Sequence, residues 1–331
     1  MGINYLIPKI KVSDTVVYQT SLFSSNDKII LAPLQNLTNY YFRQAYNKFF
    51  PNTIDYAITP FISANEGVEK ENKAKFRDVW KKNNENCIDI IPQILGNKAE
   101  QVLSVAKILE QMGYRKVNIN LGCPKKDVVN KHRGAGLLEN VEEIDRIINE
   151  IMTKTKLQLS LKVRLGNKKN DELQSLIPTI NKYPIDFVAI HARLAEQMYE
   201  GNVDVDSFQK LSAQIKTKVI YNGDIFSVED FRRLKMRFPY VNDWMLGRGV
   251  LRNPFLCGEI RGIYFDKKQI YPQFFHQLLN NFMEYSKNDE VVVNKMKEYC
   301  KYFCVGLKKD STKILHAVSL NQIVSEFETY L

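Results

Sequence analysis

The sequence predicts an α/β protein: a (β/α)8 TIM barrel followed by a small all-helical domain. Between residues 28 and 258, eight short segments rich in β-branched residues alternate with helical patterns, and about 250 residues is the usual length of such a barrel. No Gly-x-Gly-x-x-Gly follows the first predicted strand, which disfavours an open dinucleotide-binding sheet. Beyond residue 258 the strand signals stop. We therefore divide the chain into an N-terminal extension (1–27), the barrel (28–258) and the helical domain (259–331).

Most of the predicted strands are short, rich in β-branched residues and flanked by turn or helix signals, as expected for strands buried in a parallel sheet. The predicted strands are Ile29–Pro33, Asp55–Phe61, Ile88–Leu95, Lys116–Leu121, Leu159–Leu165, Asp186–His191, Lys218–Asn222 and Asp243–Gly247.

Helices are predicted where apolar residues recur at helical spacing. This spacing is clear in Lys98–Gln111 and in Val141–Met152. Asp206–Ile215 and Ser227–Arg237 begin with residue types that commonly cap a helix N-terminus. Apolar residues at helical spacing also run from Pro272 to Leu331 and predict the appended domain.

The composition is that of a soluble intracellular enzyme, since 44% of the 331 residues are hydrophobic and 25% are charged. No apolar run approaches the roughly 18 residues of a membrane span, and the first residues lack the order of a signal peptide. We therefore expect a cytoplasmic protein without membrane contact. The five cysteines have no disulfide-scaffold spacing, and no His or third Cys completes a zinc site with Cys300 and Cys304. No metal is expected, the net charge of +10 favours an anionic partner, and nothing indicates the oligomeric state.

The fourth predicted strand ends in the most informative motif of the chain. Asn118 and Asn120 are two residues apart, so they point to the same side of the strand. Gly122 permits a sharp exit and Pro124 fixes the chain just after Cys123. Cys123 therefore lies at the carboxyl end of a strand, where barrel enzymes carry their active sites. The alternative is a small buried residue without chemistry.

Polar residues also mark the ends of other strands, and this set predicts an active site at one face of the barrel. A lysine inside an apolar strand is costly unless it is paired or bound to an anion, and a structural ion pair is the alternative for a single such lysine. The set comprises Gln93, Lys162, Arg164, His191, Arg193, Asn222-Gly223-Asp224 and Gly247-Arg248-Gly249.

The glycine-rich turns after the last two strands indicate a phosphate site. Gly223 and Gly249 let the backbone approach a ligand closely, and Arg248 can make a forked contact. In many barrels these two loops bind phosphate. A flavin mononucleotide fits, with Lys162 near the N1–C2 edge of the ring and Gln93 at its pyrimidine edge.

Together these motifs resemble those of the tRNA-dihydrouridine synthase family, clearly from about residue 29 to 258 and loosely in the helical tail. The matching runs are Ala32-Pro33-Leu34 with Thr38 and Phe42-Arg43, Gln93 to Gly96, Asn120-Leu121-Gly122-Cys123-Pro124, Gly134-Ala135-Gly136-Leu137-Leu138, Lys162-Val163-Arg164, His191-Ala192-Arg193, Asn222-Gly223-Asp224 and Gly247-Arg248-Gly249. The chain departs from the family pattern at Gln35-Asn36, at Asn39, where an Asp is usual, and at Leu194, where a Thr is common.

The resemblance implies an enzyme that uses FMN, with NADPH or NADH as reductant, to reduce uridines in folded tRNA to 5,6-dihydrouridine. It implies that FMN is held by Pro33, Leu34, Gln35, Gln93, Lys162, His191, Asn222, Gly223, Asp224, Gly247 and Arg248. It also implies that Cys123 protonates C5 of the uracil while a hydride reaches C6, and that Asn120 helps orient the uracil. A thiol that stays protonated suits this acid role.

The target base must leave the RNA stack to reach a flavin, so we expect basic residues around the site to hold the RNA backbone. The expected substrate contacts are Arg164 and Arg193 at the strand ends, Lys125 and Lys126 in a loop that also carries Lys131, His132 and Arg133, and Lys297, Lys301 and Lys308 in the helical domain. The alternative for the loop and for the helical lysines is a solvated surface without RNA contact.

Two other functions remain open at this point. A dihydroorotate dehydrogenase-like flavoprotein would share the FMN site, but its small anionic substrate needs no helical tail. A flavin-free RNA-binding barrel would not need Cys123, Lys162 and Arg248 together.

Overall fold

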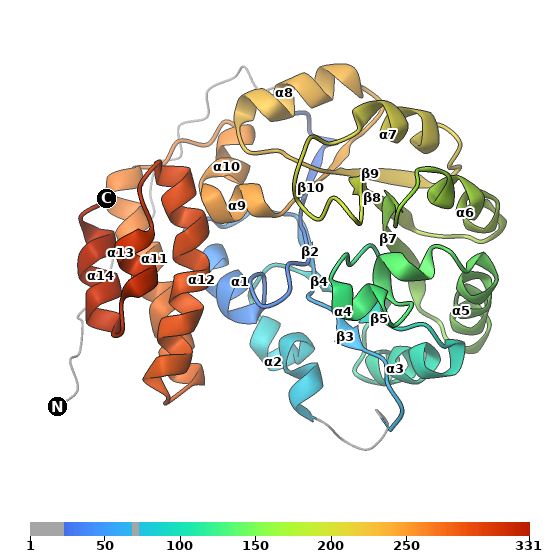
Figure 1. The fold of residues 1–331 in the computed structure, drawn as a ribbon, viewed down its shortest axis with the longest axis horizontal. Helices are drawn as coiled ribbons and strands as arrows, with labels where there is room; N and C mark the ends of the chain where they lie inside the picture. The colour runs from blue at the N-terminus through green and yellow to red at the C-terminus, as the bar shows by residue number, and fades with distance from the viewer. Residues whose placement is uncertain (1–22, 68–72) are drawn as a thin grey trace.

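The computed structural model describes residues 23–67 and 73–331 (Figure 1). Most of the predicted extension 1–27 lies outside the described residues. Ten parallel strands form one sheet in the order β3-β5-β6-β7-β8-β9-β10-β1-β2-β4. The strands are β1 Lys28–Leu31, β2 Tyr56–Ile58, β3 Ile62–Ser63, β4 Ile90–Ile91, β5 Gln93–Leu95, β6 Lys116–Leu121, β7 Gln158–Gly166, β8 Phe187–Leu194, β9 Lys218–Asn222 and β10 Asp243–Leu246.

The ten strands make an eight-stranded barrel because two of its strands are each interrupted by a proline. The predicted strand Ile88–Leu95 contains both β4 and β5, whereas the predicted strand Asp55–Phe61 contains β2 and ends just before β3. Pro60 separates β2 from β3, and Pro92 separates β4 from β5, since proline lacks the N–H that a ladder needs. β2 pairs with β4, and β3 pairs with β5. The two ends of the sheet therefore meet, and the predicted (β/α)8 barrel is confirmed.

Helices cover the outside of the sheet (Figure 1). They are α1 Tyr40–Phe49, α2 Lys81–Asn84, α3 Ala99–Gln111, α4 Lys126–Val129, α5 Val141–Lys154, α6 Asp171–Lys182, α7 Val205–Ser212, α8 Val228–Arg237, α9 Arg248–Arg252 and α10 Leu256–Ile260, with the 3-10 helices η1 Lys73–Val79 and η2 Gly134–Leu137. The four predicted barrel helices are present, with ends shifted by up to three residues.

Local capping explains several helix starts. Ser227 caps α8 as predicted, because its side chain accepts from the backbone N–H of Asp230. The predicted cap of α7 was wrong: Asp204, not Asp206, accepts from the N–H of Ser207, at 2.8 Å. Asn39, at a position where the family usually has Asp, caps α1 in the same way.

Two separate apolar clusters stabilise the barrel. One lies between the sheet and the surrounding helices and continues into the C-terminal helices. The other fills the lower interior of the barrel, where a buried apolar residue typically contributes about 1.5–3 kcal/mol. This inner cluster comprises Ile30, Ala32, Ile58, Ile91, Phe187, Ala189, Ile220 and Met245.

The C-terminal region is all helical, as predicted, with α11 Lys267–Tyr285, α12 Asp289–Leu307, α13 Thr312–His316 and α14 Leu320–Glu328. It packs on α1 through aromatic side chains: Phe42 stacks on Tyr299 with ring centroids 5.9 Å apart. Asn281 donates to the carbonyl of Tyr41 at 2.9 Å. A Cβ on Gly306 would lie 1.7 Å from the Arg252 carbonyl, so α12 can approach α9 closely only because residue 306 is glycine.

Within residues 23–67 and 73–331, no helix combines the length and apolar character needed to cross a membrane. The same residues contain no group of three or more His, Cys, Asp or Glu side chains arranged to hold a metal ion.

Candidate active site

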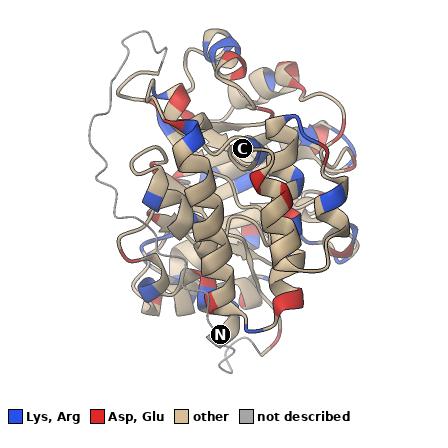
Figure 2. Ribbon diagram, turned by 90° about the vertical axis from the view of Figure 1, so that its left-hand side faces the viewer, with Lys and Arg blue, Asp and Glu red and all other residues tan. Residues whose placement is uncertain are grey.

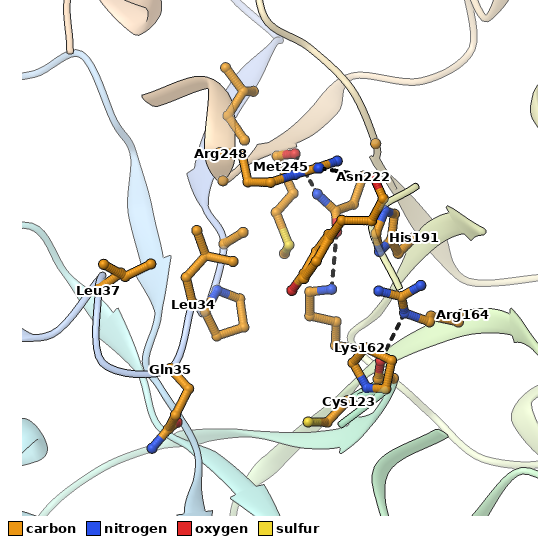
Figure 3. A pocket seen from close by; sticks show the side chains of 18 of the residues that line it. Leu34, Gln35, Leu37, Cys123, Lys162, Arg164, His191, Asn222, Met245 and Arg248 are labelled. Carbon is orange, nitrogen blue, oxygen red and sulfur yellow. Dashed lines mark hydrogen bonds between the residues drawn. The ribbon is translucent and has the colours of Figure 1, made fainter. Parts of the chain in front are cut away.

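A cavity opens at the carboxyl ends of the strands, where the sequence predicted an active site (Figure 3). The open space between its walls is about 1180 Å³, part of which communicates with solvent. Its lining brings together predicted site residues from six strand ends: Pro33, Leu34, Gln35, Asn120, Cys123, Lys125, Lys162, Arg164, His191, Asn222, Gly223, Asp224, Gly247 and Arg248.

Cys123 lies on one side of the cavity in the loop between β6 and α4 (Figure 3). Its loop is positioned by Asn120, whose amide oxygen accepts from the backbone N–H groups of Gly122 (3.1 Å) and Cys123 (2.9 Å). Burial raises the pKa of the Cys123 thiol above its ordinary value. The thiol is therefore protonated near neutral pH, as an acid must be.

Lys162 projects from β7 into the cavity between Cys123 and Asn222 (Figure 3). Its ammonium donates to Oδ1 of Asn222 at 3.0 Å, the one hydrogen bond it makes among the described residues. Burial, with a smaller contribution from the charge of Arg164, lowers the pKa of Lys162 to about 7. An ammonium with further N–H groups facing a cavity and no carboxylate partner is suited to an anionic or carbonyl-bearing ligand.

The upper cavity wall is strongly cationic. Arg193 and Arg248 share a single carboxylate, Asp224, and Arg248 donates to it at 2.6 Å. Burial, followed by the charges of Arg164 and Lys162, holds the pKa of His191 well below its usual range, so this imidazole is neutral. Four cations near one carboxylate favour a ligand that carries negative charge.

Arg164 ties two loops of the site together rather than pointing at open space. Its guanidinium donates to the carbonyls of Gly122 (3.0 Å), Leu194 (2.7 Å) and Met198 (2.8 Å). The loop that carries Cys123 is thereby joined to the loop that follows β8.

Gly223 and Gly249 line the cavity beside Arg248. Gly223 has a φ of +152°, and a Cβ there would lie 2.9 Å from the side chain of Val203. A Cβ on Gly249 would lie 2.0 Å from the carbonyl of Ile225. Both positions therefore require glycine because the protein's own neighbouring atoms leave no room for a Cβ, and the phosphate site itself stays a prediction.

Two predicted site residues lie behind the cavity lining. Gln93 is fully buried, where it donates to Asn118 and accepts from Asn120, both at 2.7 Å. Arg193 is 1% exposed and is committed to Asp224 and to the carbonyls of Glu200 and Gly201. In this arrangement both side chains support the residues that line the cavity, and their direct ligand contacts stay predictions.

The predicted RNA-contacting lysines are spread over the surface. Lys125 lines the cavity, whereas Lys126 is exposed at the start of α4. Lys297 and Lys301 lie one turn apart on α12, but Lys308 ends the helix in a left-handed conformation with a φ of 55°. Along the ribbon of the C-terminal helices, Lys and Arg positions (blue) and Asp and Glu positions (red) are interspersed (Figure 2).

Sequence reasoning missed four aromatic residues that line the cavity: Phe61, Tyr199, Phe226 and Tyr302. Tyr199 lies between the two cations Arg164 and Arg248, whose guanidinium carbons are 5.5 and 4.6 Å from its ring centroid. Tyr199 and Phe226 lie in loops after β8 and β9, where an aromatic residue is a usable signal. Tyr302 comes from α12, and no local pattern links it to the barrel.

Comparison with known proteins assigns the family. Residues 30–319 match the model described as dihydrouridine synthase. The chain belongs to the dihydrouridine synthase family. This confirms the resemblance that the motifs predicted, and it covers both the barrel and most of the helical region.

Similar curated proteins carry the same assignment. The tRNA-dihydrouridine synthase B of Pasteurella multocida is 28% identical over 237 residues, which cover 71% of this chain and 69% of that protein. The tRNA-dihydrouridine synthase B of Vibrio cholerae is 27% identical over 240 residues, or 72% of each chain.

Among solved structures, a morphinone reductase mutant in complex with tetrahydroNAD has a TM-score of 0.50 and 9% identity to this chain. The similarity covers 71% of this chain and 86% of that chain. At this identity it concerns the barrel fold alone.

Proposed function

We propose that this chain reduces uridines in tRNA to 5,6-dihydrouridine, with FMN as its flavin and NADPH or NADH as reductant. Membership of the family makes the chain a flavin-dependent oxidoreductase. The observation that carries the proposal is one cavity that places a protonated thiol, Cys123, beside the unpaired ammonium of Lys162. A dihydroorotate dehydrogenase-like or flavin-free function has no such support, and the cytoplasmic location stays a prediction.

The residues present fit an FMN. The ammonium of Lys162 is suited to the polar edge of the ring, and Asn222 holds it in place. Arg248 and the glycine turns at Gly223 and Gly249 are suited to the phosphate. Leu34 supplies an apolar wall opposite Lys162 (Figure 3), and Pro33 lines the same cavity.

When bound and reduced, the flavin supplies the hydride that C6 of the uracil accepts. C5 then requires a proton, and the Cys123 thiol is the protonated acid that faces the cavity. Asn120 fixes the backbone that carries this thiol. Arg164 holds the same loop from below, so the thiol can be kept at one position relative to the base.

The cofactor assignment is tested by Arg248→Ala. Loss of one charge-assisted contact to a phosphate costs about 1.5–3 kcal/mol, so the Kd for FMN should rise about 10- to 100-fold. Binding is measured by quenching of flavin fluorescence as FMN is added to the cofactor-free protein. The matched control is Arg232→Ala on α8, an exposed arginine remote from the cavity lining. Equal FMN affinity in wild type and Arg248→Ala would remove this arginine from the site.

The reaction is tested by mapping dihydrouridine in tRNA from cells with and without the gene for this chain. The expected result is loss of dihydrouridine at one or more positions and its restoration by the purified protein with NADPH. Reduction of a free pyrimidine acid, together with unchanged tRNA, would instead support the dihydroorotate dehydrogenase-like alternative.

A further inference from the structure

An aromatic and basic surface lies at the junction of the barrel and the C-terminal helices, outside the cavity. It is formed by Tyr40 at the start of α1, Arg77 in η1 and Tyr285 at the end of α11. We call these three residues the rim ledge. The guanidinium of Arg77 lies over the Tyr285 ring, 5.0 Å from its centroid, and 48% of Tyr285 is exposed.

The rim ledge is supported from beneath by buried aromatic residues. The ring of Tyr41 lies 4.9 Å from Tyr285 and 3.8 Å from Tyr40, centroid to centroid. Phe282 packs against Tyr41 at 5.0 Å. Tyr285 is therefore held in place although nearly half of it faces solvent, which lowers the entropic cost of binding a ligand.

Arg77 lacks an acidic partner. Burial acts to lower the pKa of Arg77, but the phenol of Tyr285, the hydrogen bond to Tyr41 and the phenol of Tyr40 together raise it above its ordinary value. No carboxylate of the described residues forms an ion pair with Arg77. A surface arginine over an exposed aromatic ring, without a carboxylate, is free to meet a planar base or a phosphate.

The rim ledge lies close to the mouth of the cavity. Leu37 lines the cavity, and Tyr40 follows it by three residues, so the two Cα atoms are at most about 11 Å apart. The hydroxyl of Tyr299 on α12 donates to the carbonyl of Leu37, which holds this loop against the helical region. A polynucleotide that leaves the cavity on the side of Leu37 would pass within one or two nucleotides of the rim ledge.

We propose that the rim ledge stacks a base of a nucleotide next to the target uridine and so holds the strand while the uridine is turned into the cavity. This inference rests on the proposed function, because it takes RNA as the occupant. Single-stranded bases are bound by stacking on aromatic rings and on arginine planes. The net charge of +10 also favours a polyanion such as RNA over an apolar partner without negative charge.

The test compares Tyr285→Ala, Tyr285→Phe and Arg77→Gln with wild type in direct tRNA binding at several salt concentrations. Stacking of one base changes affinity by about 5-fold or more, so Tyr285→Ala should raise the Kd by at least that factor, and Tyr285→Phe should restore it. Stacking releases no counterions, so the salt dependence should stay the same in Tyr285→Ala. Tyr240→Ala, an exposed aromatic in the loop before β10, is the matched control.

A second measurement locates the contact. A tRNA with 2-aminopurine next to the reduced uridine should lose fluorescence on binding wild type and Tyr285→Phe, and much less on binding Tyr285→Ala. FMN content and flavin reduction by NADPH in the absence of tRNA should match wild type in all variants, which excludes damage to the fold of the barrel.

The outcomes separate the two proposals. If wild type binds tRNA but forms no dihydrouridine, the proposed reaction fails while the binding and fluorescence comparisons still decide the rim ledge. If wild type forms dihydrouridine and Tyr285→Ala and Arg77→Gln bind tRNA as tightly as wild type, the rim ledge is overturned and the reaction stands. Failure of wild type to bind tRNA overturns both.

Discussion

On strand β8, Phe187 and Ala189 point into the lower half of the barrel, and His191 points in the same direction two residues later, in the upper half. Successive inward residues of one strand thus pass from an apolar cluster to a cationic cavity. On β7, Ser160, Lys162 and Arg164 face the interior in the same alternation.

The two halves differ in what satisfies their side chains. The lower half is closed by apolar packing, with Phe187 2% exposed and Ile220 fully buried. Between the halves, Gln93, Asn118 and Asn120 satisfy one another by hydrogen bonds of 2.7 Å. In the upper half the arginines are held by Asp224 and by backbone carbonyls, whereas Lys162 keeps one hydrogen bond to a neutral amide among the described residues, at a cost in desolvation. Apolar packing therefore stabilises the lower half of the barrel, and the upper half keeps an ammonium without a carboxylate partner where a ligand can bind.

The largest effect is expected for the upper half, from Cys123→Ala. Loss of a general acid typically costs 10²- to 10⁴-fold, so the single-turnover rate of dihydrouridine formation should fall by about that factor. FMN content and flavin reduction by NADPH should be unchanged, because the thiol serves only the uracil. Rapid-mixing absorbance of the flavin with and without tRNA checks both. A variant that reduces tRNA at the wild-type rate would remove Cys123 from the mechanism.

In the lower half, Phe187→Ala should lower the free energy of unfolding by about 3–5 kcal/mol, because it leaves a cavity in the closed apolar cluster. Phe187→Leu keeps most of the volume and should cost less than about 1.5 kcal/mol. Urea unfolding followed by circular dichroism measures both. In the folded variants the FMN affinity should equal that of wild type, and a large loss of FMN affinity would contradict the separation of the two halves.

In contrast to Phe187, Lys162 is expected to lower the stability of the cofactor-free protein while it favours FMN binding. Its pKa is about 7 in the cofactor-free fold and near 10.5 when unfolded, so the unfolded chain binds more protons between these values. The stability of the cofactor-free protein should therefore rise with pH from about 7 to about 10.5. Lys162→Met lacks this contribution.

We expect Lys162→Met to be more stable than wild type near neutral pH, with an advantage that shrinks as pH rises, and to bind FMN more weakly. Thermal unfolding of both cofactor-free proteins across this pH range, with FMN titration, provides the measurement. A constant difference in stability at all pH values would show that folding does not lower the pKa of Lys162.

The smallest effect is expected outside the barrel. If Lys297, Lys301 and Lys308 contact tRNA phosphates, replacing all three by Gln should flatten the salt dependence of tRNA binding by about one unit of slope per lost contact. FMN content should be unchanged. Titration of tRNA at two ionic strengths decides the point, and identical curves for variant and wild type would assign these lysines to a solvated surface.

Much of the fold was predictable because its signals are local. The bounds of β6 and β9 match the prediction residue for residue, since each is a short segment with β-branched residues, Val117 and Ile119 in β6 and Val219 and Ile220 in β9. Helices α1 and α6 were not predicted: α6 contains Pro178, and the inward face of α1 is largely aromatic. Pro92 also splits the predicted strand Ile88–Leu95 into β4 and β5, and after Pro60 the chain pairs again as β3, beyond the predicted strand end at Phe61.

The sequence by itself determined that polar residues gather toward one end of the barrel. Cys123 and Arg248 lie just after strands, Lys162 and His191 lie within β7 and β8, and the parallel strands bring all four to one cavity. Tertiary structure alone decided which of the polar side chains face the cavity, because Gln93 finds partners on the neighbouring strand and Arg193 does not line the cavity.

Tertiary structure also added residues that no motif connects to the site. Tyr302 lines the same cavity as Leu37 although 265 positions separate them in the chain, because α12 packs over α1 and α9. Arg77 and Tyr285 meet in the same way. Strand and helix periodicity depend on neighbours within a few residues, whereas the partner of a side chain depends on which distant helix covers it, and only the folded packing of aromatic and glycine residues determines that.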